Sequence, residues 1–250
     1  MRHEVPENLK KGGTIGFVAP SFGCTTEPYK SAFANAQKKW KEMGYQLDLG
    51  PNCYAEHGIG ISAAPEECGK ELTEYYVSEK NDCLISCGGG ELMCEDLDYV
   101  DFEKIRKAPE KWYLGYSDNT HFTYLLPTIC DTAAVYGPCA SDFGMEPWHK
   151  SVADAFGVLT GEVRTVRGYE GWERDDAKAE ARKIRICRTR LQNRAFCAAS
   201  RMRTVHLRDD SSAAVSTVSS IFLERSTTER LILWKNIKRT VLSGFWKRAI

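Results

Sequence analysis

The chain has 250 residues, of which 42% are hydrophobic, and its 34 Lys and Arg balance 34 Asp and Glu. That length suffices for one large domain or two small ones with their own hydrophobic cores. No stretch approaches the roughly 18 apolar residues that a membrane-spanning helix needs. No apolar segment follows the charged residues 1–7, so we expect a cytoplasmic protein with no secretory signal and no membrane partner.

Charge is divided unevenly along the chain. Residues 1–180 hold 18 Lys and Arg against 30 Asp and Glu, whereas residues 181–250 hold 16 against 4. All nine prolines precede residue 181, and Gly244 is the one glycine after it. A single domain seldom changes composition so abruptly, and the Arg-rich segment 181–250 is expected to be disordered or loosely helical.

The sequence holds ten cysteines, but no two of them form a Cys-x-x-Cys pair. We expect small buried thiols in a reducing compartment, with a metal site or a disulfide framework as the alternatives. We expect no cofactor.

Short apolar runs and helical stretches alternate along residues 1–160. Alternation at this spacing predicts an α/β fold in which helices flank a parallel sheet. Ligands of such sheets bind at the carboxyl ends of the strands. In chain order, the expected elements are a strand at Thr14–Ala19, a helix at Pro28–Met43, a strand at Gln46–Leu49, a helix with Ser62 as its cap and Pro65 in its first turn, a strand at Cys83–Cys87, a helical stretch from about Glu91 to Lys107 broken near Asp98, a strand at Trp112–Tyr116, a helix at Asn119–Leu126, a strand at Ala133–Tyr136 and a helix at Pro147–Leu159.

Ser117 lies where the fourth expected strand ends and the next helix begins. Gly115-Tyr116-Ser117-Asp118 is half of a nucleophile elbow, the strand-to-helix turn on which several hydrolases present a serine. In place of the elbow's second glycine stands Asn119, a residue type that tolerates left-handed backbone. The alternative is that Ser117 or Asp118 only caps the helix.

Three consecutive glycines, Gly88–Gly90, follow the third expected strand. Their backbone N–H groups could bind an anion, and with the amide of Asp118 they could form an oxyanion hole. The alternative is a simple tight turn. No G-x-G-x-x-G pattern is present, which argues against a dinucleotide site.

Three histidines, His57, His121 and His149, are candidates for a catalytic base. His121 follows Ser117 by four residues on the same expected helix, so its side chain should point along the helix rather than back toward the serine. His149 is expected at an exposed helix start. No His-x-x-x-His pair appears, and we expect no metal site.

Taken in order, the segments GTIGFVAPS, ISCGGG, LGYSDNTHFTYLL and VYGP resemble the S66 family of serine peptidases. This family contains the LD-carboxypeptidases and the microcin C self-immunity hydrolases, and the Ser-Asp-Asn-Thr run is closer to the immunity branch. The resemblance covers about residues 10–175. It implies that Ser117 attacks an amide carbonyl and that backbone amides of Asp118 and of Gly89 or Gly90 bind the oxyanion.

The resemblance also implies an α/β N-terminal domain, a β-rich C-terminal domain and an active site between them. The glutamate and histidine of the family's catalytic triad both come from the C-terminal domain. The implied substrate is a small peptide or peptidyl nucleotide whose scissile bond lies next to a free carboxylate. Homodimerisation of intact relatives is left open.

The resemblance stops after residues 169–173, and the genetic code suggests why. The codons of Ser211–Phe222 can be written with the four-codon serine set and then translated in the frame that starts at each third base. This shifted frame accommodates the peptide IGGCLDCLVNL, which resembles the family's C-terminal signature. In the same shifted frame, the codons of Trp246 and Lys247 encode a glutamate that follows an apolar residue and a leucine. The family's catalytic glutamate follows an apolar-Leu pair like this one. We therefore expect a frame slip around Asp176–Lys183, with a genuine basic appendage as the alternative.

These observations predict an S66-like domain at 1–160, a linker at 161–180 and an out-of-frame segment at 181–250. The expected function is an LD-carboxypeptidase-like serine hydrolase that is inactive in this chain for lack of the triad's Glu and His. The alternative is a non-catalytic α/β module that binds an anionic peptide or nucleotide. Nucleic-acid binding by the basic segment is not expected, because out-of-frame sequence needs no function.

Overall fold

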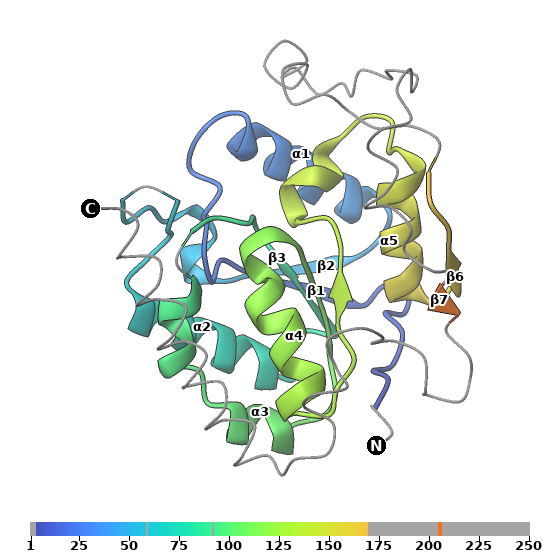
Figure 1. Cartoon of the computed structure of the whole chain (residues 1–250). Helices are drawn as coiled ribbons and strands as arrows, with labels where there is room; N and C mark the ends of the chain where they lie inside the picture. Colours follow the sequence, from blue (N-terminus) through green and yellow to red (C-terminus); the bar gives the residue numbers. More distant parts are fainter. Residues whose placement is uncertain (1–3, 59, 92, 170–204, 207–250) are drawn as a thin grey trace, which may run out of the picture.

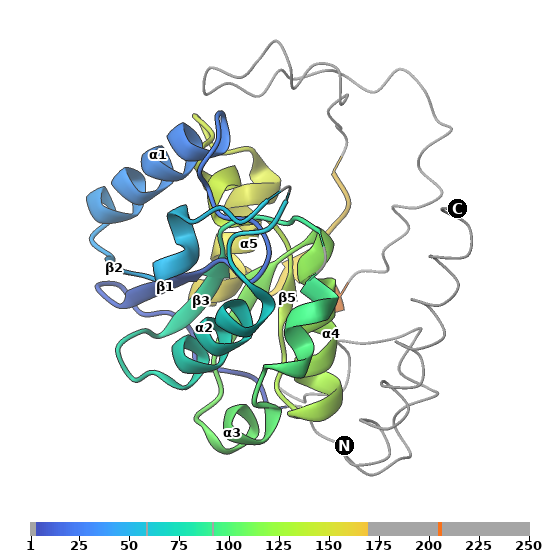
Figure 2. The ribbon, with the colours of Figure 1, turned by 90° about the vertical axis from the view of Figure 1, so that its left-hand side faces the viewer.

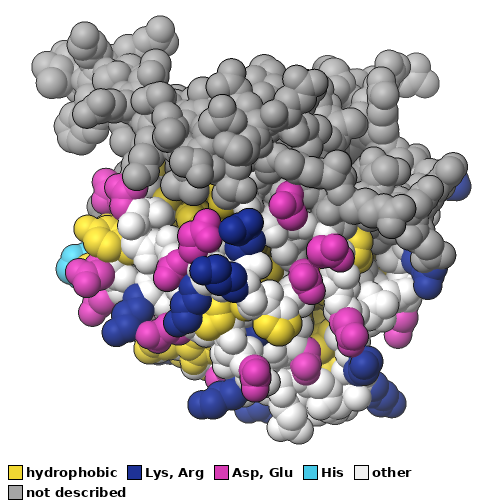
Figure 3. All heavy atoms as spheres, turned by 90° about the horizontal axis from the view of Figure 1, so that it is seen from below, with side chains coloured by type: hydrophobic (Ala, Val, Ile, Leu, Met, Phe, Trp, Pro, Cys, Tyr) yellow, Lys and Arg dark blue, Asp and Glu magenta, His cyan; other side chains and the backbone are white. Residues whose placement is uncertain are grey.

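The structure is a computed structural model that describes residues 4–58, 60–91, 93–169 and 205–206. The predictions for the remainder of residues 170–250, including the frame slip and a disordered or loosely helical segment, lie outside the described residues. In the described part, no helix is both long and apolar enough to cross a membrane. On the face seen in Figure 3, acidic and basic side chains of the described part are interspersed.

A five-stranded parallel sheet forms the centre of the fold, as the sequence predicts (Figure 1). Its strands lie in the order β2-β1-β3-β4-β5, so the chain moves outward from β1 first on one side and then on the other. The bounds are Thr14–Val18 for β1, Gln46–Leu49 for β2, Cys83–Ser86 for β3, Trp112–Gly115 for β4 and Val135–Tyr136 for β5.

Helices cover both faces of this sheet (Figures 1 and 2). Successive side chains of a strand point to opposite faces, so Ile85 and Leu114 pack with helices α1 and α5, whereas Leu84 and Tyr113 pack with α2, α3 and α4. Burial on both sides explains why the inner strands, β1, β3 and β4, are mainly apolar. The helices are α1 (Tyr29–Glu42), α2 (Pro65–Val77), α3 (Phe102–Lys107), α4 (Thr120–Ile129) and α5 (Lys150–Thr160).

Several expected boundaries need correction. Ser62 does not cap α2: Ala64 occupies the cap position, while Ser62 is buried and its hydroxyl donates to the Ala19 carbonyl. Pro65 opens the helix as predicted. The stretch expected as a broken helix from Glu91 is a 3₁₀ segment, η2 (Met93–Asp98), followed by α3. Helix α5 begins three residues later than predicted. The remaining 3₁₀ segments are η1 (Pro51–Tyr54), η3 (Ser117–Asn119) and η4 (Ala140–Gly144).

Two further strands lie apart from this sheet. Strand β6, Thr165–Val166, pairs antiparallel with β7, Val205–His206. The predicted linker, 161–180, therefore contains a short strand. All eight cysteines of the described range are free thiols, and Cys94 alone among them is not buried.

Candidate active site

The carboxyl ends of β1, β3 and β4 lie side by side and bring three loops together. Val18 pairs with Ser86, and Ile85 pairs with Leu114, all in parallel register. The segments that follow these strands therefore emerge at the same edge of the sheet. They are the loop after β1, the glycine turn Gly88–Gly90 and the turn that carries Ser117.

Ser117 has a left-handed backbone, with φ of 61°. It follows the end of β4 by two residues and begins η3, which continues into α4. Left-handed backbone is costly for a residue with a Cβ, and such strain is concentrated at functional sites. Strand, strained serine and helix together have the geometry of a nucleophile elbow.

Asn119 does not carry the strained backbone, contrary to the sequence-based expectation. Its φ of −61° and ψ of −8° are right-handed. Its side chain is fully buried, and its amide nitrogen donates to the carbonyls of Gly88 (2.9 Å) and Tyr116 (3.1 Å). Its amide oxygen accepts from the Tyr113 hydroxyl at 2.5 Å. Asn119 therefore ties the glycine turn to the elbow.

This buried amide also explains the glycine two positions before the serine. A Cβ on Gly115 would lie 2.8 Å from Cγ of Asn119. Real Cβ atoms essentially never approach so closely, and the neighbour here is a side chain fixed by hydrogen bonds. Gly115 thus makes room for the link between the two loops.

The glycine turn lies directly against the serine, as the sequence predicts. A Cβ on Gly89 would be 2.9 Å from Cβ and 3.1 Å from Oγ of Ser117. Gly90 has a φ of 133°, which L side chains rarely adopt. Within the described residues, no hydrogen bond engages the backbone N–H of Gly89, Gly90 or Asp118. The first N–H groups of a helix lack intrahelical partners, so Asp118 offers a donor for an oxyanion.

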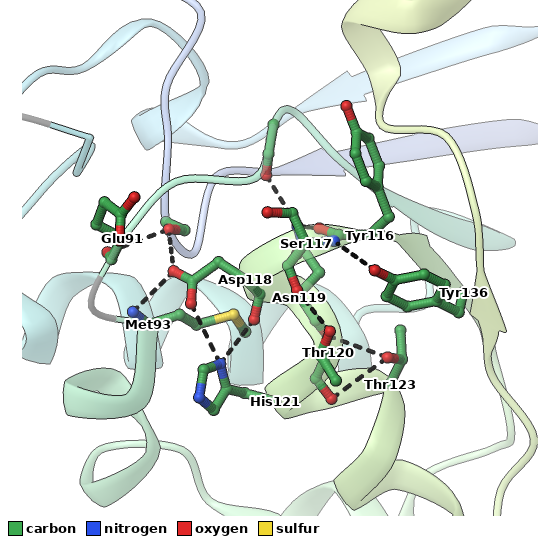
Figure 4. A network of polar contacts seen from close by, with 12 residues as sticks. Glu91, Met93, Tyr116, Ser117, Asp118, Asn119, Thr120, His121, Thr123 and Tyr136 are labelled. Carbon is green, nitrogen blue, oxygen red and sulfur yellow. Dashed lines mark hydrogen bonds and ion pairs between the residues drawn. The ribbon is translucent and has the colours of Figure 1, made fainter. Parts of the chain in front are cut away.

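The Asp118 carboxylate holds several loops together (Figure 4). Oδ2 accepts from the Ser21 hydroxyl at 2.5 Å and from the Met93 backbone N–H at 2.9 Å, and Oδ1 lies 3.2 Å from Nδ1 of His121. Burial alone would raise the pKa of Asp118, but the hydrogen bonds from His121, Ser21 and Met93 outweigh it and lower the pKa. Asp118 is therefore held as a carboxylate.

His121 faces Asp118 rather than Ser117, as its helical position predicts (Figure 4). Its Nδ1 also lies 2.7 Å from the Asp118 carbonyl oxygen. His149 caps the start of α5, where its Nδ1 accepts from the Ser151 N–H. The backbone N–H of His57 donates to the Ile61 carbonyl in the loop before α2. Among the described residues, no hydrogen bond joins any of these three histidines to the Ser117 hydroxyl.

The family model of the LD-carboxypeptidase N-terminal domain, Peptidase S66, matches residues 15–137. Residues 15–137 thus belong to the S66 peptidase family. The matched range runs from within β1 to just beyond Tyr136, and it agrees with the resemblance found in the sequence.

Two curated relatives are similar to this chain. A probable murein peptide carboxypeptidase of Bacillus subtilis is 29% identical over 149 residues, which are 58% of this chain and 44% of the relative. A putative carboxypeptidase of Vibrio cholerae is 30% identical over 142 residues, which are 56% of this chain and 41% of the relative. The chain thus spans less than half the length of each.

Solved structures agree with the S66 fold. The microcin C7 self-immunity protein MccF in complex with aspartyl sulfamoyl adenosine superposes with a TM-score of 0.65 at 22% identity, covering 76% of this chain and 58% of that one. An MccF-like protein from Bacillus anthracis gives a TM-score of 0.65 at 22% identity and covers 76% and 56%. At this identity the likeness shows the fold alone.

Two residues at this edge of the sheet had no assigned role in the sequence analysis. Tyr136, at the end of β5, accepts a hydrogen bond from the Ser117 backbone N–H at 3.2 Å (Figure 4). Ser21 is buried beside the glycine turn and bonds Asp118. Both lie within the quoted motifs VYGP and GTIGFVAPS, but their contacts join segments far apart in the sequence, so local pattern does not reveal them.

The described part of the S66 chain has no group of three or more His, Cys, Asp and Glu residues suited to a metal ion. The chemistry that this edge supports is attack by a hydroxyl, with backbone N–H groups available to the developing negative charge.

Proposed function

We propose that this chain carries the nucleophile half of an LD-carboxypeptidase-like serine hydrolase. Ser117 is the nucleophile, and the backbone N–H groups of Gly89, Gly90 and Asp118 bind the oxyanion. The observation that carries the proposal is the left-handed backbone of Ser117, whose side chain lies directly against Gly89. A residue that only capped the helix would not need a strained backbone beside unused N–H donors.

The proposed substrate is a small molecule with an amide bond next to a free carboxylate. Two classes fit the relatives: a murein peptide, as in the name of the Bacillus subtilis relative, or an aminoacyl nucleotide. MccF is known in complex with glutamyl sulfamoyl guanosine and with aspartyl sulfamoyl adenosine. These names describe the relatives and support the class for this chain.

We propose further that the 250-residue chain itself has little or no peptidase activity. Among the described residues no base contacts the Ser117 hydroxyl, and His121 is bound to Asp118. The proposed division places the S66-like domain at 1–160, a linker at 161–180 and out-of-frame sequence at 181–250. A serine without its general base is a weak nucleophile, and losing triad members lowers the rate by several orders of magnitude.

Covalent labelling of the purified chain with a fluorophosphonate tests the role of Ser117, with Ser117→Ala as control. A slow adduct that disappears in S117A supports the nucleophile. If no adduct forms while an anionic peptide or nucleotide still binds, the non-catalytic module is the better description. Rapid cleavage of a murein tetrapeptide by the purified chain, abolished in S117A, would contradict the proposed inactivity.

The frame slip has its own test. Resequencing the locus across the codons for residues 170–190 and beyond the present stop codon should reveal one inserted or deleted base and a restored family-like frame. An intact single frame through this region would favour a genuine basic appendage.

A further inference from the structure

The side chain of Asp118 joins three segments, and neither the sequence motifs nor the proposed chemistry requires this. Ser21 lies in the loop after β1, Met93 opens η2 just after the glycine turn, and Asp118 belongs to the elbow. Both the Ser21 hydroxyl and the Met93 N–H donate to the same oxygen, Oδ2. One carboxylate oxygen therefore connects all three.

The glycine turn is enclosed by these contacts. The carbonyl of Gly89 accepts from the Phe22 N–H at 2.9 Å, next to Ser21 in sequence. The Ser21 hydroxyl also lies 3.3 Å from the Glu91 carbonyl oxygen. A Cβ on Gly90 would collide with this hydroxyl. The single hydroxyl proton belongs with the nearer acceptor, Asp118, because that bond is short and charge-assisted.

We infer that Ser21 and the Asp118 carboxylate form a clamp that sets the distance between the two halves of the oxyanion site. This inference rests on the proposed function. One half is the N–H of Asp118 itself, and the other is the N–H groups of Gly89 and Gly90. Ser21 is a positioning residue: its hydroxyl is buried and acts through Asp118 and the turn, not on the substrate.

The clamp differs from an ordinary buried hydrogen bond in what its loss should change. Removing the Ser21 hydroxyl leaves Asp118 with fewer donors and frees the turn to move away from the elbow. Oxyanion stabilisation depends on donors at about 2.7–3.1 Å from the oxygen, so a small displacement weakens it. A purely structural serine would lower stability without this effect.

Ser62 provides a matched control. It is as buried as Ser21, its hydroxyl also makes one short hydrogen bond, and that bond goes to the Ala19 carbonyl in the same loop. No hydrogen bond joins its side chain to Asp118 or to the glycine turn in the described part of the chain. Ser62→Ala and Ser21→Ala should therefore lower the melting temperature similarly.

The test uses the full chain with Ser117→Cys, because a thiol adds to an activated ketone without the triad's Glu and His. The probe is trifluoroacetone. The introduced sulfur bonds to the carbonyl carbon, the C=O π bond breaks, the oxygen becomes the oxyanion, and the thiol proton passes to water. Fluorine NMR measures the adduct's dissociation constant and the pKa of its hydroxyl. The chain that keeps Ser117 is the control, because any adduct it forms comes from the native cysteines.

We expect the S117C adduct to have a lower hydroxyl pKa than the adduct of free cysteine. Adding S21A should raise the dissociation constant about tenfold or more, whereas adding S62A should change it less than about twofold. Equal effects of S21A and S62A, or no effect of either, would overturn the clamp and leave the proposed function standing. An S117C adduct no better than that of free cysteine would overturn both.

Hydrogen exchange provides a second measurement that needs no adduct. In the chain that keeps Ser117, S21A should speed exchange of the Met93 N–H, because its acceptor, the Asp118 carboxylate, is then no longer held by Ser21. S62A should leave this exchange unchanged. Unchanged exchange in S21A would contradict the clamp even if the cysteine variant failed to fold.

Discussion

Asn119→Ala should destabilise the domain more than Ser21→Ala or Ser62→Ala. The change removes two donor bonds, to Gly88 and Tyr116, and one acceptor bond, from Tyr113. The Gly88 carbonyl keeps only its hydrogen bond from the Ser86 hydroxyl. A buried hydrogen bond contributes about 1 kcal/mol, so the loss of three predicts a destabilisation of about 3 kcal/mol. For a chain of this size that corresponds to a fall in Tm of about 6–12 °C.

Urea unfolding followed by tryptophan fluorescence measures this loss, because Trp40 and Trp112 are buried. Asn35→Ala is the matched control: its amide makes one bond, to the Gly144 carbonyl, and the side chain is only half-buried. It should cost about 1 kcal/mol or less.

A double-mutant cycle with Tyr113→Phe isolates the shared bond. Y113F alone should cost about 1 kcal/mol, and N119A with Y113F should cost about 1 kcal/mol less than the sum of the two. Fully additive losses, or an N119A chain within about 0.5 kcal/mol of N35A, would refute the idea that this amide joins the glycine turn to the elbow.

Three further predictions concern the same edge. Burial raises the pKa of Glu71 to about 7, against hydrogen bonds from the N–H groups of Ala19 and Asn52 that lower it. Because the folded pKa is raised, its stabilising contribution should be fully present below about pH 4.5 and lost as pH rises through about 7; urea midpoints at pH 5 and pH 8 should differ less in Glu71→Gln. Ser117→Gly should be at least as stable as Ser117→Ala, because relief of a left-handed backbone costing about 1–2 kcal/mol offsets the entropy of glycine; a clearly less stable S117G in thermal melts would argue against strain at this turn. Gly89→Ala should abolish fluorophosphonate labelling, since its Cβ would meet the Ser117 side chain, and labelling at the parent rate would place the turn elsewhere.

The sequence predicts the sheet well because its inner strands β1, β3 and β4 are short, mainly apolar runs. Cys83–Ser86 and Trp112–Gly115 lie within one residue of the expected strands. The proximity of the glycine turn to Ser117 is also predicted, since parallel strands end at one edge.

The sequence fails where long-range contacts override local preference. Ser62 looks like a helix cap, but the Ala19 carbonyl, 43 residues earlier, takes its hydroxyl. The sequence suggests that Asn119 adopts a left-handed backbone, but the structure uses its side-chain amide as a hydrogen-bond donor. The left-handed backbone belongs to Ser117 itself. The Ala19 and Gly88 carbonyls that accept these hydrogen bonds are distant in sequence, so no local pattern encodes the two contacts.

The tie between the Asn119 amide and the Gly88 carbonyl has a practical consequence. The elbow and the glycine turn are joined by hydrogen bonds between residues of the matched range 15–137, so residues beyond this range do not supply this contact. Such a half is a natural candidate for fragment complementation: a separately expressed C-terminal domain from an intact relative could be mixed with it, and regained turnover would report reassembly of a split hydrolase.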